Sequence, residues 1–210
     1  MNRNKNIKIK VNTNSAINGM YSMVKMFVLA LITFIMIFTF VFRVATVDGS
    51  SMENTLYDKD KIIVTELYSK PEAGDIVVAN SAETLGKIIV KRVIATEGQT
   101  LKIDYDKNQV VVDGIVYDEP YISTTTNEPT DYWNIPNVIP EGYVFVMGDN
   151  RSFSLDSRDA RLQLVSVNDI VGKADFIVFP FDRVQFLNWW GVNNEWNSKY
   201  TVVSRSYDQN

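Results

Sequence analysis

The sequence predicts an all-β, largely antiparallel domain preceded by one apolar N-terminal segment. Among its 210 residues, short β-branched runs of strand length recur after residue 60, separated by turn residues. Asp113-Gly114 lies between two such runs and is the strongest short-range signal for a two-residue hairpin. Because no window in this part has a helical period of adequate length, an all-β domain is favoured.

The apolar segment covers residues 26–42, seventeen residues without a charge between Lys25 and Arg43. As a helix it would be about 26 Å long, close to the length that crosses a bilayer when flanking residues join in. A cleavable secretory signal also has a basic start, but its apolar run is shorter and ends in small residues. We therefore expect a retained transmembrane helix over residues 26–44.

The charges are distributed unevenly along the chain. Residues 1–25 carry five basic residues and no acid, whereas the rest of the chain carries 16 basic and 25 acidic residues. The positive-inside rule then predicts a cytoplasmic tail over residues 1–25 and an extracytoplasmic domain over residues 45–210. A single span would anchor this domain at the cell membrane, and the span itself would be in contact with lipid. The acidic body argues against a nucleic-acid partner.

The expected strands follow the β-branched runs at residues 61–64, 75–79, 87–94, 109–112, 115–117, 143–147 and 175–179. The polar, proline-containing segment 121–140 is expected to be an inserted loop. Trp189, Trp190 and Trp196 near the C-terminus fit packing of the core and its rim, or an aromatic edge at the membrane interface.

The chain contains no His and no Cys. This excludes Ser-His-Asp triads, Cys nucleophiles, His/Cys zinc sites, thiol redox centres and disulfides. No metal or organic cofactor is implied. Any catalysis must therefore use Ser, Thr, Lys, Tyr or carboxylates.

Lys91 is the candidate base, because it lies within the most apolar run after the N-terminal segment. A lysine can accept a proton if burial lowers its pKa from about 10.4 toward neutrality. With the period of a strand, Ile89, Lys91 and Val93 share one face. The alternative is a lysine that guards an edge strand against aggregation.

Two further clusters carry polar side chains. Gly49-Ser50-Ser51-Met52 follows the apolar segment, and its glycine would let backbone N–H groups turn toward a substrate carbonyl, although a Ser-rich linker has the same composition. Residues 148–158 combine turn formers with two acids and two arginines, as a solvated loop with surface ion pairs also would. The Ser-x-x-Lys spacing of Ser22 and Lys25 lacks the accompanying motifs of penicillin-recognising enzymes and is attributed to chance.

Taken in order, these clusters resemble the sequence boxes of the bacterial type I signal peptidases, which are membrane-bound serine proteases with a Ser/Lys dyad. The matching segments are Ser51-Met52-Glu53-Asn54-Thr55-Leu56, Gly74-Asp75-Ile76-Val77, Val90-Lys91-Arg92-Val93 and residues 148–158. The resemblance extends to residue 180. It implies coiled antiparallel β-sheets and an endopeptidase that removes signal peptides from secreted preproteins after a small-x-small sequence.

By this resemblance, Ser51 is the nucleophile and Lys91 the general base, while the Ser51 N–H stabilises the oxyanion. Ser154 would orient the Lys91 amine through a hydrogen bond. Asp156 and Arg158 would form a structural ion pair, and two scaffold residues are implied at Asp149 and Arg151. The candidates for oxyanion and substrate binding are Gly49, Ser50, Met52, Ile88, Ile89 and Val90.

In the family, the signal peptide lies extended beside the catalytic strands and adds a strand to them. Shallow apolar pockets then accept small residues at the first and third positions before the cut and exclude larger ones.

Three positions depart from the family pattern. Asn54 stands where a Pro is usual, which would loosen the turn after Ser51. Gly49 lacks the hydroxyl that one branch of the family uses in the oxyanion hole, with Ser50 as a substitute. Residues 94–99 replace a Gly-x-Pro-Gly-Asp run.

Two alternatives to an active peptidase follow. A catalytically weak relative would act as an assembly factor for cell-surface proteins if these departures distort the dyad. A self-cleaving repressor-type Ser/Lys protease shares the related β fold, but the apolar span and the lack of a DNA-binding module argue against it.

Overall fold

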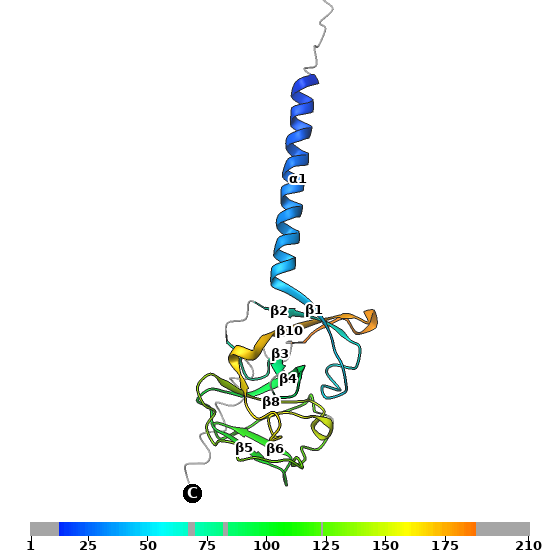
Figure 1. Ribbon diagram of the computed structural model, residues 1–210. Coiled ribbons are helices and arrows are strands. Elements are labelled where there is room, and N and C mark those ends of the chain that lie inside the picture. Colours follow the sequence, from blue (N-terminus) through cyan, green and yellow to red (C-terminus); the bar gives the residue numbers. More distant parts are fainter. Residues whose placement is uncertain (1–12, 67–69, 82–83, 123, 188–210) are drawn as a thin grey trace, which may run out of the picture. The chain divides into compact units, whose positions relative to one another are not determined.

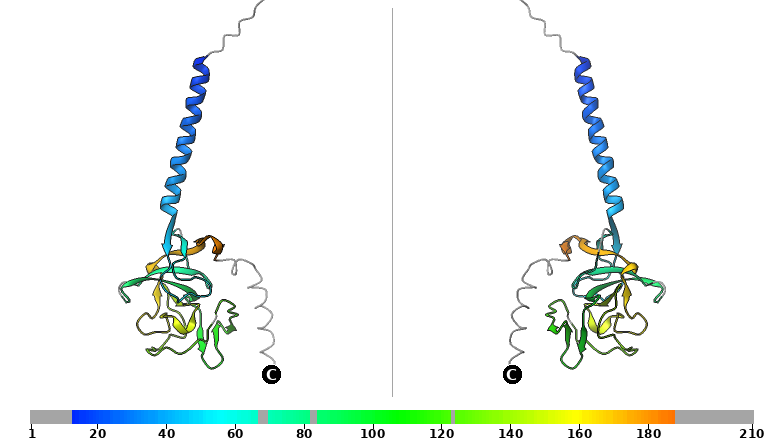
Figure 2. Two further views of the ribbon diagram at one scale, coloured as in Figure 1. Left: turned by 90° about the vertical axis from the view of Figure 1, so that its right-hand side faces the viewer. Right: turned by 90° about the vertical axis from the view of Figure 1, so that its left-hand side faces the viewer.

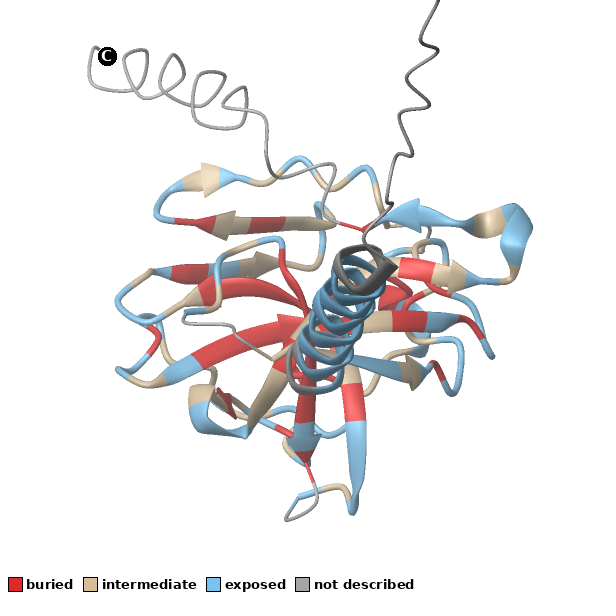
Figure 3. Cartoon of the chain, turned by 90° about the horizontal axis from the view of Figure 1, so that it is seen from above, coloured by how far each residue is buried: buried red, intermediate tan, exposed pale blue. Residues whose placement is uncertain are grey.

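The computed structural model describes residues 13–66, 70–81, 84–122 and 124–187, and divides into a helical unit and a β domain (Figure 1). The first unit contains one helix, α1 (Thr13–Val41), of 29 residues. Its stretch Ile17–Met36 is apolar and exposed, and is pale blue in Figure 3. Twenty such residues give about 30 Å of helix, the thickness of a bilayer's hydrocarbon core. α1 is thus long and apolar enough to cross a membrane.

α1 begins and ends earlier than the helix expected over residues 26–44. Phe42–Thr46 forms strand β1 instead, antiparallel to β2 (Lys61–Thr65), with Phe42 opposite Thr65. Pairing with β2 gives these residues ladder hydrogen bonds that favour the strand over further helix. The first twelve residues of the basic tail, and the C-terminal tryptophans Trp189, Trp190 and Trp196, lie outside the described residues.

The β domain is built on an antiparallel eight-stranded sheet with the order β1-β2-β10-β3-β4-β8-β9, in which β11 also pairs with β10. The remaining strands of this sheet are β3 (Ile76–Ser81), β4 (Lys87–Thr96), β8 (Tyr143–Met147), β9 (Val165–Ser166), β10 (Ile170–Phe179) and β11 (Gln185–Phe186). Short 3-10 helices cover Arg151–Phe153, Val167–Asp169 and Phe181–Arg183. The sequence prediction of an all-β, antiparallel domain behind one N-terminal apolar helix is confirmed.

A second sheet of three strands contains β5 (Leu101–Asp104), β6 (Gln109–Val112) and β7 (Ile115–Val116). Figures 1 and 2 show this sheet, in green, at one end of the β domain. Asp113 and Gly114 join β6 to β7, with φ angles of 52° and 79°. Two consecutive positive φ angles are typical of a type I′ turn, so the predicted hairpin is confirmed.

The interior contains three apolar clusters. Figure 3 shows that the strands carry many of the buried segments, in red. β3 contributes to two of them, because Ile76 and Val78 pack into one cluster and Val77 and Ala79 into another. A strand buried on both faces explains its continuous apolar sequence. The third cluster packs the small sheet against β8, which includes the fully buried Phe145.

Candidate active site

Ser51 and Lys91, forty residues apart in the sequence, meet in the structure. The Lys91 amine donates hydrogen bonds to Ser51 Oγ at 2.7 Å and to the Val90 carbonyl oxygen at 3.1 Å. Lys91 is only 5% exposed and its amine contacts Ser51 instead of solvent, so the alternative of an exposed lysine that guards an edge strand is wrong. A hydroxyl beside a buried amine has the geometry of a nucleophile and its base.

Burial lowers the pKa of the Lys91 amine to about 8, because the ammonium loses hydration in the protein interior. The carboxylates of Asp156 and Asp149 raise this pKa, whereas the charges of Lys87 and Arg158 lower it. A measurable fraction of the amine is therefore neutral near physiological pH, as a general base requires.

Ser51 begins a tight turn that ends at Leu56. The N–H groups of Thr55 and Leu56 donate to the Met52 carbonyl oxygen at 2.9 and 2.8 Å. Met52 and Leu56 are buried in the first core cluster, which anchors the turn. Asn54 is exposed, and the turn closes with Asn54 in place of the usual Pro.

The Ser51 N–H makes no hydrogen bond to another described residue, so it is free to bind a ligand. Gly49 has a φ of 98°, and its N–H donates to Asp58 Oδ1 at 2.9 Å. The Gly49 N–H is therefore already engaged, while the neighbouring Ser50 is exposed. Between the N–H groups of Gly49 and Ser51, that of Ser51 is the one that suits an oxyanion.

A buried ion pair connects β4 to the 148–158 box. Arg92 Nε and Nη2 donate to the two carboxylate oxygens of Asp149 at 2.8 and 2.7 Å, and the two side chains are 6% and 1% exposed. Thr55 Oγ1 also donates to Asp149, so the turn of Ser51 joins the same pair. One carboxylate thus fixes the two segments that carry Ser51 and Lys91.

Arg151 and Glu119 form a second buried pair, whose side chains are 0% and 4% exposed. Arg151 also donates to the Gly148 carbonyl oxygen and to Thr126 Oγ1, each at 3.1 Å. Two residues beyond Glu119, the Tyr121 ring lies 4.0 Å from the Arg92 guanidinium carbon. The predicted inserted loop therefore packs against the candidate site.

Asp156 and Arg158 form the ion pair expected from the sequence. Arg158 Nε and Nη2 both donate to the Asp156 carboxylate at 2.8 Å, and both side chains are buried. The Gly148 N–H donates to the same carboxylate at 3.0 Å. Because these charges and those of Asp149 and Arg151 are buried, the alternative of a solvated loop with surface ion pairs is wrong.

Ser154 lies beside the site without the contact expected for it. Its Oγ is buried and has no hydrogen-bond partner among the described residues, so the expected bond to Lys91 is not formed in this structure. A Cβ added to Gly148 would overlap with this Oγ and with the Ser51 carbonyl oxygen. Ser154 and Ser51 therefore both pack against Gly148. An unpaired buried hydroxyl is costly, and a catalytic role is one of the reasons for which a protein keeps such a group.

We expect Gly148→Ala to lower kcat/KM by about 100-fold, because the new methyl group would displace the Ser51 backbone by a fraction of an ångström or more. The measurement is peptide-bond cleavage together with thermal unfolding. Gly172→Ala is the matched control, because its Cβ would overlap with the Thr65 carbonyl oxygen at 2.5 Å in the β2–β10 pair. Equal losses of activity per folded molecule in both variants would contradict the prediction.

The substrate-pocket candidates lie in different environments. Met52 and Ile89 are buried within core clusters, Val90 is half-buried against one of them, and Ile88 is 63% exposed. β3 pairs with residues 87–92 of β4, whereas β8 pairs only with residues 92–96 on the other side. Residues 87–91 therefore have an edge without a strand partner in the described part of the chain.

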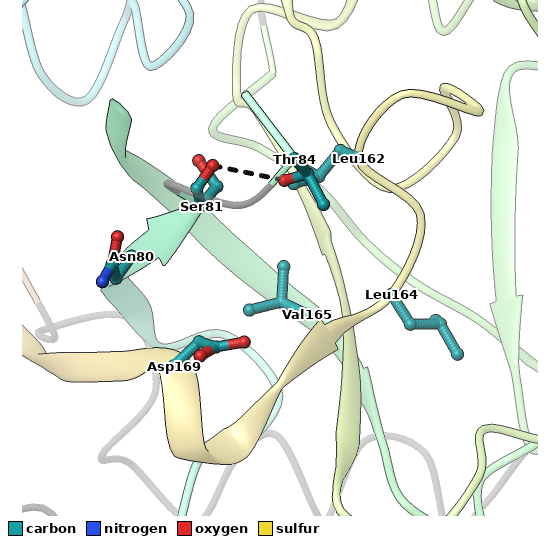
Figure 4. Close-up of a pocket in the computed structure, with 7 residues that line it drawn as sticks. All are labelled: Asn80, Ser81, Thr84, Leu162, Leu164, Val165 and Asp169. Atoms are coloured by element: carbon teal, nitrogen blue, oxygen red, sulfur yellow. Dashed lines mark hydrogen bonds between the residues drawn. The ribbon is translucent and has the colours of Figure 1, made fainter. Parts of the chain in front are cut away.

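A separate pocket of about 120 Å³ lies between the end of β3 and β9 (Figure 4). Thr84 Oγ1 donates to the Ser81 carbonyl oxygen at its rim, at 3.3 Å. Its lining residues are Asn80, Ser81, Thr84, Leu162, Leu164, Val165 and Asp169. Neither Ser51 nor Lys91 lines this pocket, which is distinct from the candidate site.

Sequence reasoning missed several residues that hold the site together. Arg92 and Thr55 stood inside recognised boxes but were given no role, and Glu119 and Tyr121 lay at or near the start of a segment interpreted as a loop. Asn150 also stood inside a recognised box without a role. One signal was available for Arg92: it follows Lys91 in an apolar strand, and a buried arginine implies a buried partner.

Comparison with known proteins gives a consistent result. The family described as "Signal peptidase, peptidase S26" matches residues 20–179. The chain is 31% identical to signal peptidase I of Bacillus licheniformis over 80% of this chain and 93% of that protein. It is 32% identical to signal peptidase I T of Bacillus subtilis over 88% of this chain and 98% of that protein. The crystal structure of a signal peptidase I from Enterococcus faecalis matches 50% of this chain and 97% of that chain, with 27% identity and a TM-score of 0.41.

Proposed function

The chain belongs to the peptidase S26 family of signal peptidases, and within this family we propose that Ser51 is its nucleophile and Lys91 its general base. Family membership makes it a type I signal peptidase, a serine endopeptidase that acts on preproteins carrying signal peptides. The observation that carries the assignment of residues is the 2.7 Å contact between the buried Lys91 amine and Ser51 Oγ.

The reaction begins when neutral Lys91 takes the proton of Ser51 and Ser51 Oγ attacks the scissile carbonyl carbon. The free Ser51 N–H donates to the oxyanion that forms. As the tetrahedral intermediate collapses, the Lys91 ammonium protonates the leaving amine. Lys91 then takes a proton from water, which attacks the acyl-enzyme, and returns that proton to Ser51 Oγ as the second tetrahedral intermediate collapses and releases the signal peptide.

Ser154 is proposed to orient the Lys91 amine during this cycle. Its buried Oγ has no partner among the described residues, and it packs against Gly148 as Ser51 does. An ammonium has three donors, of which Ser51 and the Val90 carbonyl accept two. The third is available for Ser154, which would stabilise the protonated lysine after the first proton transfer.

We propose that the signal peptide binds as an added strand along residues 87–91 of β4, whose second edge is unpaired in the described part of the chain. Backbone hydrogen bonds would hold the peptide, and shallow pockets near Ile88 and Val90 would require small residues before the cut. Met52, in the core cluster against which Val90 packs, would form the floor on that side, and Ile89, in the second cluster, would form it on the other.

The membrane orientation is a further part of the proposal. α1 would anchor the enzyme, with the basic tail in the cytoplasm and the β domain on the other side, where translocated preproteins emerge. Because the chain has no Cys, single Cys residues introduced at Asn6 and Asp118 report the topology through a membrane-impermeant maleimide on intact cells. Labelling at position 6 alone would contradict this orientation.

The experiment that tests the function uses the full chain in detergent and a preprotein with Ala at the first and third positions before the cut. We expect one cleavage after the small-x-small sequence, identified by the mass of the mature product. Replacing the Ala before the cut with Trp should lower cleavage at least about 100-fold, because a shallow pocket excludes a large ring. Cleavage that ignores this change would contradict the proposal.

The pH dependence of kcat/KM follows from the pKa of Lys91, which burial lowers to about 8. Only the neutral amine accepts the Ser51 proton, so activity should rise about tenfold per pH unit below 8 and level off above it. At pH 7 we expect about one-tenth of the plateau. A pH series with a small-x-small peptide measures this, and a profile flat from pH 6 to 9 would argue against Lys91 as the base.

A further inference from the structure

Asn150 holds the turn of Ser51 from the 148–158 box. It is 6% exposed, its backbone N–H donates to the Ser51 carbonyl oxygen at 3.1 Å, and its side-chain Nδ2 donates to the Ser50 carbonyl oxygen at 3.1 Å. The Glu53 N–H also donates to the Ser50 oxygen, at 3.1 Å. Two successive carbonyls at the start of the turn are thus bound by one residue from a distant segment.

Thr124 determines which way the Asn150 amide faces. The Ser152 N–H donates to Thr124 Oγ1 at 3.1 Å, and the Thr124 hydroxyl donates in turn to Asn150 Oδ1 at 3.3 Å. With its oxygen bound by Thr124, the amide presents its NH₂ group to the Ser50 carbonyl. A hydrogen-bond chain therefore runs from the inserted loop to the peptide unit before Ser51.

This peptide unit carries the oxyanion donor. The Ser50–Ser51 bond is trans, and in a planar trans peptide the N–H points opposite to the C=O. By binding the Ser50 carbonyl, Asn150 turns the Ser51 N–H in the opposite direction, away from Asn150. That N–H makes no hydrogen bond within the described part of the chain.

We propose that Asn150, held by Thr124, is a positioning residue that presets the Ser51 N–H to receive the oxyanion. The inference rests on the proposed role of Ser51 as nucleophile, and it adds the residue that orients the Ser51 backbone N–H. Preset donors stabilise charge that develops in the transition state without reorganising during the reaction. Asn150 does not itself touch the substrate, so its effect should be confined to states that carry the oxyanion.

The first test compares wild type with Asn150→Ala. We expect kcat to fall about 10- to 100-fold, while KM changes less than about twofold. This loss of kcat would not exceed the loss caused by deleting an oxyanion donor outright. The apparent pKa of the pH profile should stay at its wild-type value, because Lys91 is untouched. A general loss of structure would instead lower the unfolding temperature and change KM as well.

A peptide aldehyde with a small-x-small sequence gives a second readout. Ser51 Oγ adds to its carbonyl carbon, the carbonyl oxygen becomes the oxyanion, and Lys91 holds the displaced proton. In Asn150→Ala, affinity for the aldehyde should fall by the same factor as kcat/KM, whereas affinity for the matching peptide carboxamide should not change. Equal loss of both affinities, or wild-type kcat, would overturn the inference.

Thr124→Val keeps the test decisive if Asn150→Ala does not fold. It removes the hydroxyl that orients Asn150 and should lower kcat about 3- to 10-fold with the same pH profile. Asn127→Ala is the matched control, because Asn127 is an exposed residue of the same loop whose side chain, among the described residues, donates only to Ser152 Oγ, at 3.3 Å. Wild-type kcat in Thr124→Val would count against the inference.

Ser51→Ala separates the two proposals. If wild type is no more active than Ser51→Ala, the proposed nucleophile is wrong. If Ser51→Ala is inactive while Asn150→Ala and Thr124→Val cleave like wild type, only the positioning role of Asn150 fails.

Discussion

Ser51→Ala and Lys91→Met are each expected to lower kcat/KM for a preprotein by about 10⁴-fold or more. In the proposed mechanism Ser51 supplies the oxygen that forms the acyl-enzyme and Lys91 is its base, and the Lys91 amine lies 2.7 Å from Ser51 Oγ. A chain without His lacks the side chain that most often serves as a general base, and Met at position 91 cannot accept a proton. The double variant should be no worse than either single variant, because the two groups act as one unit.

The matched controls are Ser152→Ala and Lys102→Met, which change exposed residues of the same types. Both should keep wild-type kcat/KM in the same detergent assay. If Lys91→Met retains more than about one-hundredth of wild-type activity while Ser51→Ala does not, another group removes the Ser51 proton and the assignment of the base is wrong.

Lys91→Met should lose activity without losing stability, which separates chemistry from unfolding. The pKa of Lys91 falls from 10.5 to about 8 on folding, so below pH 8 the buried ammonium costs the folded state about 3 kcal/mol. Between pH 8 and 10.5 the unfolded state binds more protons, so stability rises with pH in wild type. Met carries no such charge, and the variant should unfold at an equal or higher temperature at pH 7.

Asp149→Ala should have the largest effect on stability, about 3–5 kcal/mol, because it leaves the buried Arg92 guanidinium without its carboxylate. This is a large share of the 5–15 kcal/mol by which a domain is typically stable. Activity should fall with it, since Asp149 joins Arg92, next to Lys91, to Thr55 in the turn of Ser51. Denaturant unfolding followed by near-UV circular dichroism measures the change.

Two further variants identify the cause of that loss. Asp118→Ala removes an exposed carboxylate and should change stability by less than about 0.5 kcal/mol. Asp149→Ala combined with Arg92→Met should be more stable than Asp149→Ala alone, because the unpaired buried charge is gone. If the double variant is less stable than the single one, the cost arises from lost packing rather than from the uncompensated guanidinium.

The sequence by itself determined the features that depend on neighbouring residues. β-branched runs predicted β2, β3, β4 and β8, and Asp113-Gly114 predicted the type I′ hairpin, because strand and turn preferences act over a few residues. The sequence also narrowed the chemistry, since a chain without His or Cys must use Ser, Thr, Lys, Tyr or carboxylates, and Lys91 lies in an apolar run that would lower its pKa. The boxes then pointed to Ser51 and Lys91 through resemblance.

Only the tertiary structure decided where the short strands form. β1, β9 and β11 have no local pattern of their own and exist because each pairs with a longer strand. α1 ends at Val41 for the same reason, since Phe42 pairs with Thr65 instead of continuing the helix. Pairing energy from a distant strand outweighs local preference at these positions.

The arrangement of the site was likewise decided by contacts between distant segments. Arg92 and Asp149 are 57 residues apart, Thr55 and Asp149 are 94 apart, and no local rule selects such partners. Lys91 has a lowered pKa because the folded domain removes water from its amine, and a sequence pattern cannot measure that desolvation. The direction of the Ser51 N–H depends in the same way on Asn150, which reaches it only in the folded chain.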